Sequence, residues 1–291
     1  MAAKYTLRQR VVRQLCVYVA ISIVLAFWPF RFWRRSSAPL GLSRTSEHNP
    51  SLFEAGVASV SGIKRCVYIN LDRRRDRRAR IEKELARASL DCTRISAVEV
   101  GAGDVDALQG CWDGGKRQCS GKLGCQQSHV AALSFALHNG WDHVAVFEDD
   151  FEWFSAVQPS RLGQIIHDVR SQHIDWNVIL LTGNVISHAI LDPVETVVTK
   201  LHPKKVSNIT RINDAQTTTA YMVRGEYIGV LLEVFKSCDV KVDSVAAIDS
   251  CWKKLQDKTW YGFTPNLGTQ SPGYSDIERE VVNYQEAFER L

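Results

Sequence analysis

Short apolar runs alternate with segments of helical periodicity along most of the chain. Runs rich in β-branched and aromatic residues predict strands over residues 66–71, 143–147 and 176–181, with a further apolar segment over 217–223. Apolar residues at helical spacing predict helices over 79–88, 130–137, 159–169 and 227–235. This alternation favours an α/β fold with a mostly parallel sheet flanked by helices. In such sheets the ligand site lies beyond the carboxyl ends of the strands, here after Leu71 and Phe147.

The first 60 residues have a different pattern. The uncharged stretch Gln14–Phe30 would span about 25 Å as a helix, the lower limit for crossing a bilayer. Bulky residues follow it where a cleaved signal peptide has small ones, so an uncleaved anchor is favoured. Four basic residues precede the span and three follow it, which places the N-terminus in the cytosol. We predict a cytosolic tail over 1–13, a transmembrane signal anchor over 14–33, a stem over 34–60 and one folded domain over 61–291.

The charge of the folded part differs from that of the whole chain. The net charge is +4, but seven of the 36 Lys and Arg residues lie in the first 35 positions, where there is no acid. Without these seven, 29 basic residues face 32 acidic ones, a net of −3. This balance argues against a generic nucleic-acid binder, and we expect no nucleic-acid partner.

Two features agree with a lumenal domain. Asn208 begins an Asn-Ile-Thr glycosylation acceptor triplet. Seven of the eight cysteines follow the predicted anchor, and an oxidising compartment would permit disulfides, leaving one thiol unpaired. Cys111 with Cys119 and Cys238 with Cys251 are the candidates for short loops, although connectivity stays open. No pair has the C-x-x-C spacing of a structural zinc site.

Glu148-Asp149-Asp150 directly follows the apolar run at 143–147 and carries the strongest chemical signal. Three acids at the end of a buried strand repel one another unless a cation or solvent relieves them. Oxygen ligands in this number suit Mg²⁺ or Mn²⁺, which could bind a diphosphate. The alternative is an ordinary solvated acidic turn.

Six arginines lie between positions 73 and 80, after the first predicted strand and at the start of a helix. One or two of them, with the helix N-terminus, could hold a diphosphate. The other arginines are expected to form a solvated helix face. The alternatives are a nuclear-localisation or nucleic-acid patch and a run that is solvated throughout.

Two further segments are ambiguous. Gly121–His129 leads into a helix, and His129 has an ordinary interpretation as a structural histidine. Asp249 is predicted to be a helix N-cap, but it could also take a proton from a hydroxyl. The aromatic residues Trp260, Tyr261 and Phe263 could form the floor of a sugar site.

Taken in order, Val67–Asp72 with Asp76-Arg77-Arg78, Gly121–His129 and Val146–Asp150 resemble glycosyltransferase family 25, which includes collagen and lipooligosaccharide galactosyltransferases. The resemblance covers about residues 63–291. It implies a GT-A-like, Rossmann-like fold, a divalent metal, a UDP-sugar donor and inversion at the anomeric carbon. One departure is Lys122, which stands where the family usually has an acid.

We hypothesise that the chain is a metal-dependent, inverting hexosyltransferase in a Golgi or endoplasmic-reticulum membrane. It would move galactose or glucose from a UDP-sugar to an acceptor hydroxyl on a protein or glycan. The alternative is an inactive lectin-like or adhesion protein on the same fold, which Lys122 favours and the intact acidic triplet disfavours. The expected roles are Mn²⁺ (or Mg²⁺) ligation by Glu148 and Asp150, donor binding by Asn70, Arg73, Arg77, Ser128 and Asp149, and general base catalysis by Asp249.

Overall fold

The computed structural model describes residues 63, 65–101, 103, 116–159, 162, 169, 174–188, 197–199, 207–238, 247–257 and 259–289. All of them belong to the second of two compact units, Ala55–Leu291. The predicted tail, anchor and stem lie outside the described residues, as does most of the predicted helix 159–169. In the described ranges, no helix combines the length and apolarity that crossing a bilayer requires.

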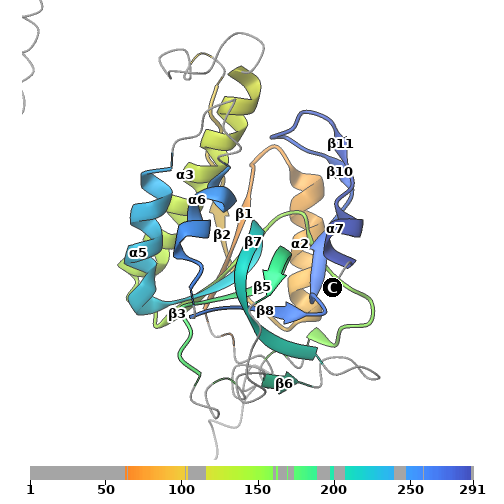
Figure 1. Cartoon of the computed structure of the whole chain (residues 1–291). Helices are drawn as coiled ribbons and strands as arrows, with labels where there is room; N and C mark the ends of the chain where they lie inside the picture. Colours follow the sequence, from red (N-terminus) through yellow and green to blue (C-terminus); the bar gives the residue numbers. More distant parts are fainter. Residues whose placement is uncertain are drawn as a thin grey trace, which may run out of the picture. The chain divides into compact units, whose positions relative to one another are not determined.

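A seven-stranded sheet forms the centre of this unit (Figure 1). Its path is β2-β1-β3-β7-β5-β8, with β6 paired to β7. The strands are β1 (Cys66–Asn70), β2 (Thr93–Ser96), β3 (His143–Glu148), β5 (Val178–His188), β6 (Val197–Thr199), β7 (Ser207–Arg224) and β8 (Trp260–Thr264).

The sheet is mixed but mostly parallel. β1 runs parallel to β2 and β3, and β5 runs parallel to β8. β7 is antiparallel to β3, β5, β6 and β8, so within this described sheet the other six strands share one direction. The predicted α/β fold and mostly parallel sheet are therefore confirmed. The predicted apolar segment 217–223 is part of the long reversed strand, which the alternation of elements did not predict.

Two small antiparallel pairs accompany the main sheet. β4 (Phe151–Trp153) pairs with β9 (Gly268–Gln270), and β10 (Gly273–Tyr274) pairs with β11 (Val281–Val282). The helices are α2 (Arg75–Arg87), α3 (Lys116–His138), α5 (Gly225–Lys236), α6 (Ile248–Cys251), the 3₁₀ helix η4 (Trp252–Leu255) and α7 (Gln285–Glu289).

The helices cover both faces of the sheet, with α3, α5 and α6 on one side and α2 on the other (Figure 1). β3 shows the consequence, because its side chains alternate between two hydrophobic cores. Val144 and Val146 pack in the core beneath α3 and α5, whereas Ala145 and Phe147 pack in the core beneath α2. All four side chains have no exposed surface. A strand buried on both faces has the continuous apolar sequence from which this strand was predicted.

Candidate functional site

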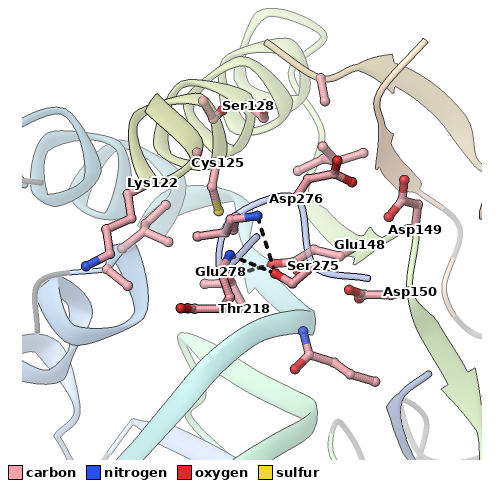
Figure 2. A pocket seen from close by; sticks show the side chains of 18 of the residues that line it. Lys122, Cys125, Ser128, Glu148, Asp149, Asp150, Thr218, Ser275, Asp276 and Glu278 are labelled. Carbon is pink, nitrogen blue, oxygen red and sulfur yellow. Dashed lines mark hydrogen bonds between the residues drawn. The ribbon is translucent and has the colours of Figure 1, made fainter. Parts of the chain in front are cut away.

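A pocket of about 390 Å³ lies beyond the carboxyl ends of β1 and β3 (Figure 2). This is the edge at which the fold class predicts a ligand site. The start of α3, the residues around α6 and the turn 275–279 also line it. All eight predicted site residues line this one pocket, namely Asn70, Arg73, Arg77, Ser128, Glu148, Asp149, Asp150 and Asp249.

Arg77 binds two acids of the triplet. Its Nη1 lies 2.9 Å from Oδ1 of Asp149 and 3.2 Å from Oδ2 of Asp150. The amide of Asn70 donates to the other oxygen of Asp149 at 2.7 Å. Oδ1 of Asp150, by contrast, is buried and has no hydrogen-bond partner. The cluster therefore keeps one buried acceptor for a group that can reach it from the pocket.

The charge of this cluster is not balanced by Arg77. Burial raises the pKa of Asp150 to about 7, and the neighbouring Glu148 adds to the rise while Arg77 opposes it. Burial also raises the pKa of Asp149, against Arg77 and the Asn70 hydrogen bond. The unpartnered oxygen and the excess of acids fit a hard divalent cation with oxygen ligands.

Glu148 has different neighbours. His129 Nε2 lies 3.1 Å from its Oε1, and the hydroxyl of Thr218 donates to the same oxygen at 2.6 Å. Burial opposes ionisation of Glu148, but these hydrogen bonds outweigh it and hold its pKa below the usual value. The other ring nitrogen of His129 contacts Tyr221 Oη at 2.9 Å. His129 is thus buried with both nitrogens engaged, as expected of a structural histidine, yet one partner is a pocket acid.

A thiol lies beside this pair. The ligand atoms of Cys125, His129 and Glu148 all lie within 4.8 Å of one another. Figure 2 shows the sulfur of Cys125 directed from α3 into the pocket. Neither Cys125 nor Thr218 was predicted to be a site residue. Their contact with Glu148 is tertiary, so no spacing in the sequence could have revealed it.

The arginines of the 73–80 segment divide into two groups. Arg73 pairs with Glu99 at 2.7 Å and with Asp276 at 2.9 Å, and Arg74 also binds Asp276. Arg73 and Arg77 line the pocket, and Arg74 binds the pocket residue Asp276, whereas the side chains at positions 75, 78 and 80 are exposed to solvent. The prediction that part of the run is a solvated helix face is confirmed.

Ser128 lines the pocket, but its hydroxyl is hydrogen-bonded to backbone groups on both sides. It donates to the carbonyl of Gly124 at 2.6 Å and accepts the amide of Val98 at 2.8 Å. It therefore fastens α3 to the segment after β2. Gly121 has a related effect, because a Cβ there would lie 2.9 Å from Cα of Ile277. Only glycine lets α3 approach the turn that carries Asp276 this closely.

The prediction that Asp249 caps a helix is wrong. Ala247 is the residue at the cap of α6, and no side chain caps the helix. Asp249 Oδ2 instead accepts the backbone amide of Thr217 in β7 at 3.0 Å. Thr217 has φ +83°, a left-handed conformation that is unusual for a β-branched residue. Burial raises the pKa of Asp249, and the charge of Glu148 adds to it.

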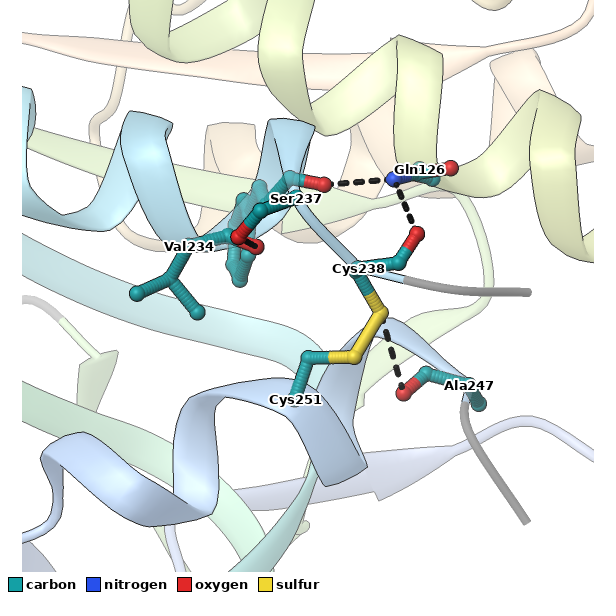
Figure 3. The surroundings of a disulfide bond; sticks show 7 residues. Gln126, Val234, Ser237, Cys238, Ala247 and Cys251 are labelled. Atoms are coloured by element: carbon teal, nitrogen blue, oxygen red, sulfur yellow. Dashed lines mark hydrogen bonds between the residues drawn. A yellow bond between two sulfur atoms is a disulfide. The ribbon is translucent and has the colours of Figure 1, made fainter. Parts of the chain in front are cut away.

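A disulfide fixes the short helix that carries Asp249 (Figure 3). It joins Cys238, two residues after α5, to Cys251 at the end of α6, and this pair is one of the two candidates for a short loop in the sequence. The amide of Gln126 in α3 donates to the carbonyl of Cys238 at 2.9 Å and also to that of Phe235. The three helices behind the pocket are therefore tied to one another.

The remaining cysteines of the described chain are two further disulfide-bonded sites and one free thiol. A disulfide between Cys66 and Cys92, which was not predicted, joins β1 to the segment before β2. Cys119 is disulfide-bonded too, and Cys111, its candidate partner in the sequence, lies outside the described residues. Cys125 is the free thiol of the described part of the chain.

The predicted aromatic floor is wrong. Trp260, Tyr261 and Phe263 belong to β8 and are buried in the two cores, because β8 pairs into the sheet. Tyr284 and Phe288, near the C-terminal end of the described chain, line the pocket instead. They follow β11 and do not belong to the aromatic run from which the floor of a sugar site was predicted.

Comparison with known proteins gives a consistent family. Residues 64–246 match the family described as glycosyltransferase family 25 (LPS biosynthesis protein). Procollagen galactosyltransferase 1 of Danio rerio is 32% identical over 130 residues, which are 41% of this chain and 21% of that protein. Procollagen galactosyltransferase 1-A of Xenopus laevis is 29% identical over 123 residues, 39% of this chain and 20% of that protein. These matches span about a fifth of the length of the two curated relatives.

Among solved structures, the crystal structure of A197 from STIV aligns with a TM-score of 0.35 and 9% identity. The alignment covers 75% of this chain and 93% of that chain.

Proposed function

The chain belongs to glycosyltransferase family 25, and on that premise we propose that it transfers a hexose from a UDP-sugar to an acceptor hydroxyl. Galactose is the first candidate, because the two relatives are named as galactosyltransferases. The observation that carries the proposal is the pocket in which all eight predicted site residues meet. Its volume of about 390 Å³ lies within the range typical of small-molecule sites.

The acidic cluster is the proposed diphosphate end of the pocket. Glu148 and Asp150 would hold Mn²⁺ or Mg²⁺, and Asp150 Oδ1 offers a buried acceptor without a hydrogen-bond partner. A cation bound there would offset the negative charge that develops on the departing diphosphate. Arg73 and Arg77, at the same edge, would bind phosphate oxygens by charge-assisted hydrogen bonds. Asp149, oriented by Asn70 and Arg77, would contact the ribose or the donor sugar.

Asp249 is the proposed general base. The raised pKa of Asp249 lies closer to physiological pH, which makes its carboxylate a better proton acceptor there. The hydrogen bond from the Thr217 amide would hold its carboxylate in place in the pocket. Asp276 is a weaker candidate, because the hydrogen bonds from Arg73 and Arg74 outweigh its burial and lower its pKa. Inversion requires a single base on the face opposite the leaving group.

A secretory membrane is the proposed location, with a single anchor and a lumenal catalytic domain. The disulfides Cys66–Cys92 and Cys238–Cys251 support an oxidising compartment. The relatives named for procollagen suggest a protein or glycan acceptor that passes through the same compartment.

A direct assay tests the donor and the metal together. The purified full chain is incubated with a panel of UDP-sugars and Mn²⁺, and UDP release is measured. We expect Mn²⁺-dependent release with one UDP-hexose and its loss in Asp150→Asn. Glu278→Gln, which removes a carboxylate that lines the pocket outside the cluster, is the matched control and keeps the activity.

The same assay addresses the non-catalytic alternative, which is favoured by Lys122 at the position of the family's usual acid. Lys122 lines the pocket. If the chain binds a UDP-sugar with Mn²⁺ but releases no UDP with any donor, it is a binding protein on a glycosyltransferase fold.

A further inference from the structure

Cys125 and His129 of α3 point to a second kind of ligand in the pocket. Residues four apart on a helix share one face, one turn above the other. Across from them lies Glu148, with its Oε1 3.1 Å from Nε2 of His129. All three ligand atoms lie within 4.8 Å of one another. One thiol, one imidazole and one carboxylate therefore converge on the same small space.

The chemistry of this set differs from that of the acidic cluster. Mg²⁺ and Mn²⁺ prefer oxygen ligands, whereas thiolate and imidazole favour Zn²⁺ and bind it more tightly than Mn²⁺. Ligand atoms around a tetrahedral zinc ion lie roughly 3.3–3.6 Å apart, as follows from its bond lengths. Side-chain rotations that move the Cys125 sulfur and the Glu148 carboxylate by about an ångström would bring the three ligand atoms into that range. The fourth position would face the pocket.

Two of the three side chains are held by hydrogen bonds with neighbouring residues, as the ligands of metal sites usually are. The hydroxyl of Tyr221 lies 2.9 Å from Nδ1 of His129, and Thr218 donates to Glu148 at 2.6 Å. Hydrogen bonds of this kind hold the ring and the carboxylate of metal ligands in orientation. His129 is 1% exposed and Tyr221 is fully buried, so the orientation is fixed by packing as well.

We propose that Cys125, His129 and Glu148 form a zinc site that shares Glu148 with the oxygen-ligand site at Asp150. On binding, the Cys125 thiol loses its proton to solvent and the sulfur becomes a thiolate ligand. The His129 ring carries its proton on Nδ1, which donates to Tyr221 Oη, so that the lone pair of Nε2 can bind the cation. The contact between His129 and Glu148 is replaced by bonds from both side chains to the cation. A zinc ion held there removes Glu148 from the Mn²⁺ set, so zinc inhibits transfer. Zinc binding itself stands apart from the proposed function, and only the inhibition rests on it.

Cobalt substitution tests the binding without any sugar donor. The full chain is freed of metal with a chelator and titrated with Co²⁺, a spectroscopic substitute for Zn²⁺. We expect one equivalent to produce a thiolate-to-cobalt absorption band in the near ultraviolet, which Zn²⁺ then abolishes. Cys125→Ser should lose the band and bind zinc at least about 100-fold more weakly, since outer-shell changes alone cost 10- to 100-fold.

Two further variants keep the test decisive if Cys125→Ser folds poorly. Tyr221→Phe retains the ring but loses the hydroxyl that supports His129, and should bind zinc about 10-fold more weakly with the band intact. Glu278→Gln, a pocket acid outside the set, should match the wild type. Absence of the band in the wild-type chain, or its persistence in folded Cys125→Ser, would overturn the proposal.

The inhibition is measured separately, in the UDP-release assay. Zinc should lower Mn²⁺-dependent release by the wild-type chain, and excess Mn²⁺ should restore it. Cys125→Ser, compared with its own zinc-free rate, should resist zinc. A cobalt band with no UDP release in any condition would retain the zinc site and reject the proposed function. UDP release that zinc inhibits equally in both proteins would reject the shared ligand.

Discussion

Replacing Asp249 by Asn and by Ala separates the two roles of this carboxylate. Asn keeps an oxygen that can accept the amide of Thr217, but it cannot take a proton from an acceptor hydroxyl. Ala removes both functions. If Asp249 is the base, both variants should lower transfer by roughly 10²-fold or more. Only Ala should also lower the stability of the domain substantially.

The size of the stability effect follows from the contact. A hydrogen bond to a charged acceptor contributes about 1.5–3 kcal/mol, and Ala would leave the Thr217 amide without its acceptor. For a domain of this size that loss corresponds to a decrease in Tm of roughly 3–12 °C. Asn keeps a neutral hydrogen bond and removes a buried charge whose pKa is raised by burial and by Glu148. These changes offset each other, so its Tm should stay within a few degrees.

Three measurements decide whether Asp249 is the general base. Thermal melts give the stability, calorimetry with the UDP-sugar gives donor affinity, and UDP release with acceptor gives transfer. We expect Asp249→Asn to lose transfer while its donor affinity and Tm stay near those of the wild type. Near-wild-type transfer by this variant would refute the role of base. The carboxylate would then be a structural acceptor for Thr217, and Asp243, outside the described residues, or Asp276 would need testing.

Three further predictions concern the surroundings of the pocket. The pKa of Asp150 is about 7 in the folded chain against an ordinary 3.8, so the metal-free fold loses stability as pH rises through this window, at most about 1.4 kcal/mol per unit. In melts with chelator, Asp150→Asn should flatten this part of the profile and raise Tm at pH 8; an unchanged slope would contradict it. Gly121→Ala should weaken donor binding in calorimetry and cost about 1–3 kcal/mol, because its Cβ collides with the facing turn. Gly229→Ala, with open space around the new Cβ, should be neutral or stabilising by up to about 1 kcal/mol, and equal effects would reject the collision. Removing the Cys238–Cys251 disulfide by a double Ser substitution should cost about 3 kcal/mol in urea unfolding, since it closes a 13-residue separation; an unchanged midpoint would show that the loop is held by other contacts.

The elements that the sequence predicted best are those whose burial is uniform. β3 is apolar at consecutive positions because both of its faces are covered, and its limits were predicted within one residue. α3 was recognised only from residue 130, yet it begins at Lys116. Its first half is rich in polar residues and glycine, so no apolar stripe marks it. The length of a helix cannot be read from apolar spacing where its environment is mixed.

The residues that line the candidate pocket were predicted from their types and positions, and the contacts between them were not. The acidic triplet and Arg77 stood out because charges follow a buried strand. The contact between Thr217 and Asp249 could not be predicted, since it depends on the reversed direction of β7 and on the placement of α6. The convergence of Cys125 on Glu148 has the same origin. Residue type identified the chemistry, whereas packing between distant segments decides which groups act on each other.

The reversed strand β7 also determines the order in which the domain can be completed during synthesis. β1, β2 and β3 lie within the first half of the described chain and can pair as soon as Glu148 has emerged. β3 then remains an open edge until residues 220–224 arrive to pair with it, about 70 residues later. An open apolar edge strand is a template for pairing between chains. Any chain that ends before Ala220 would leave this edge of β3 unpaired permanently, so we expect such truncations to aggregate rather than fold into a smaller domain.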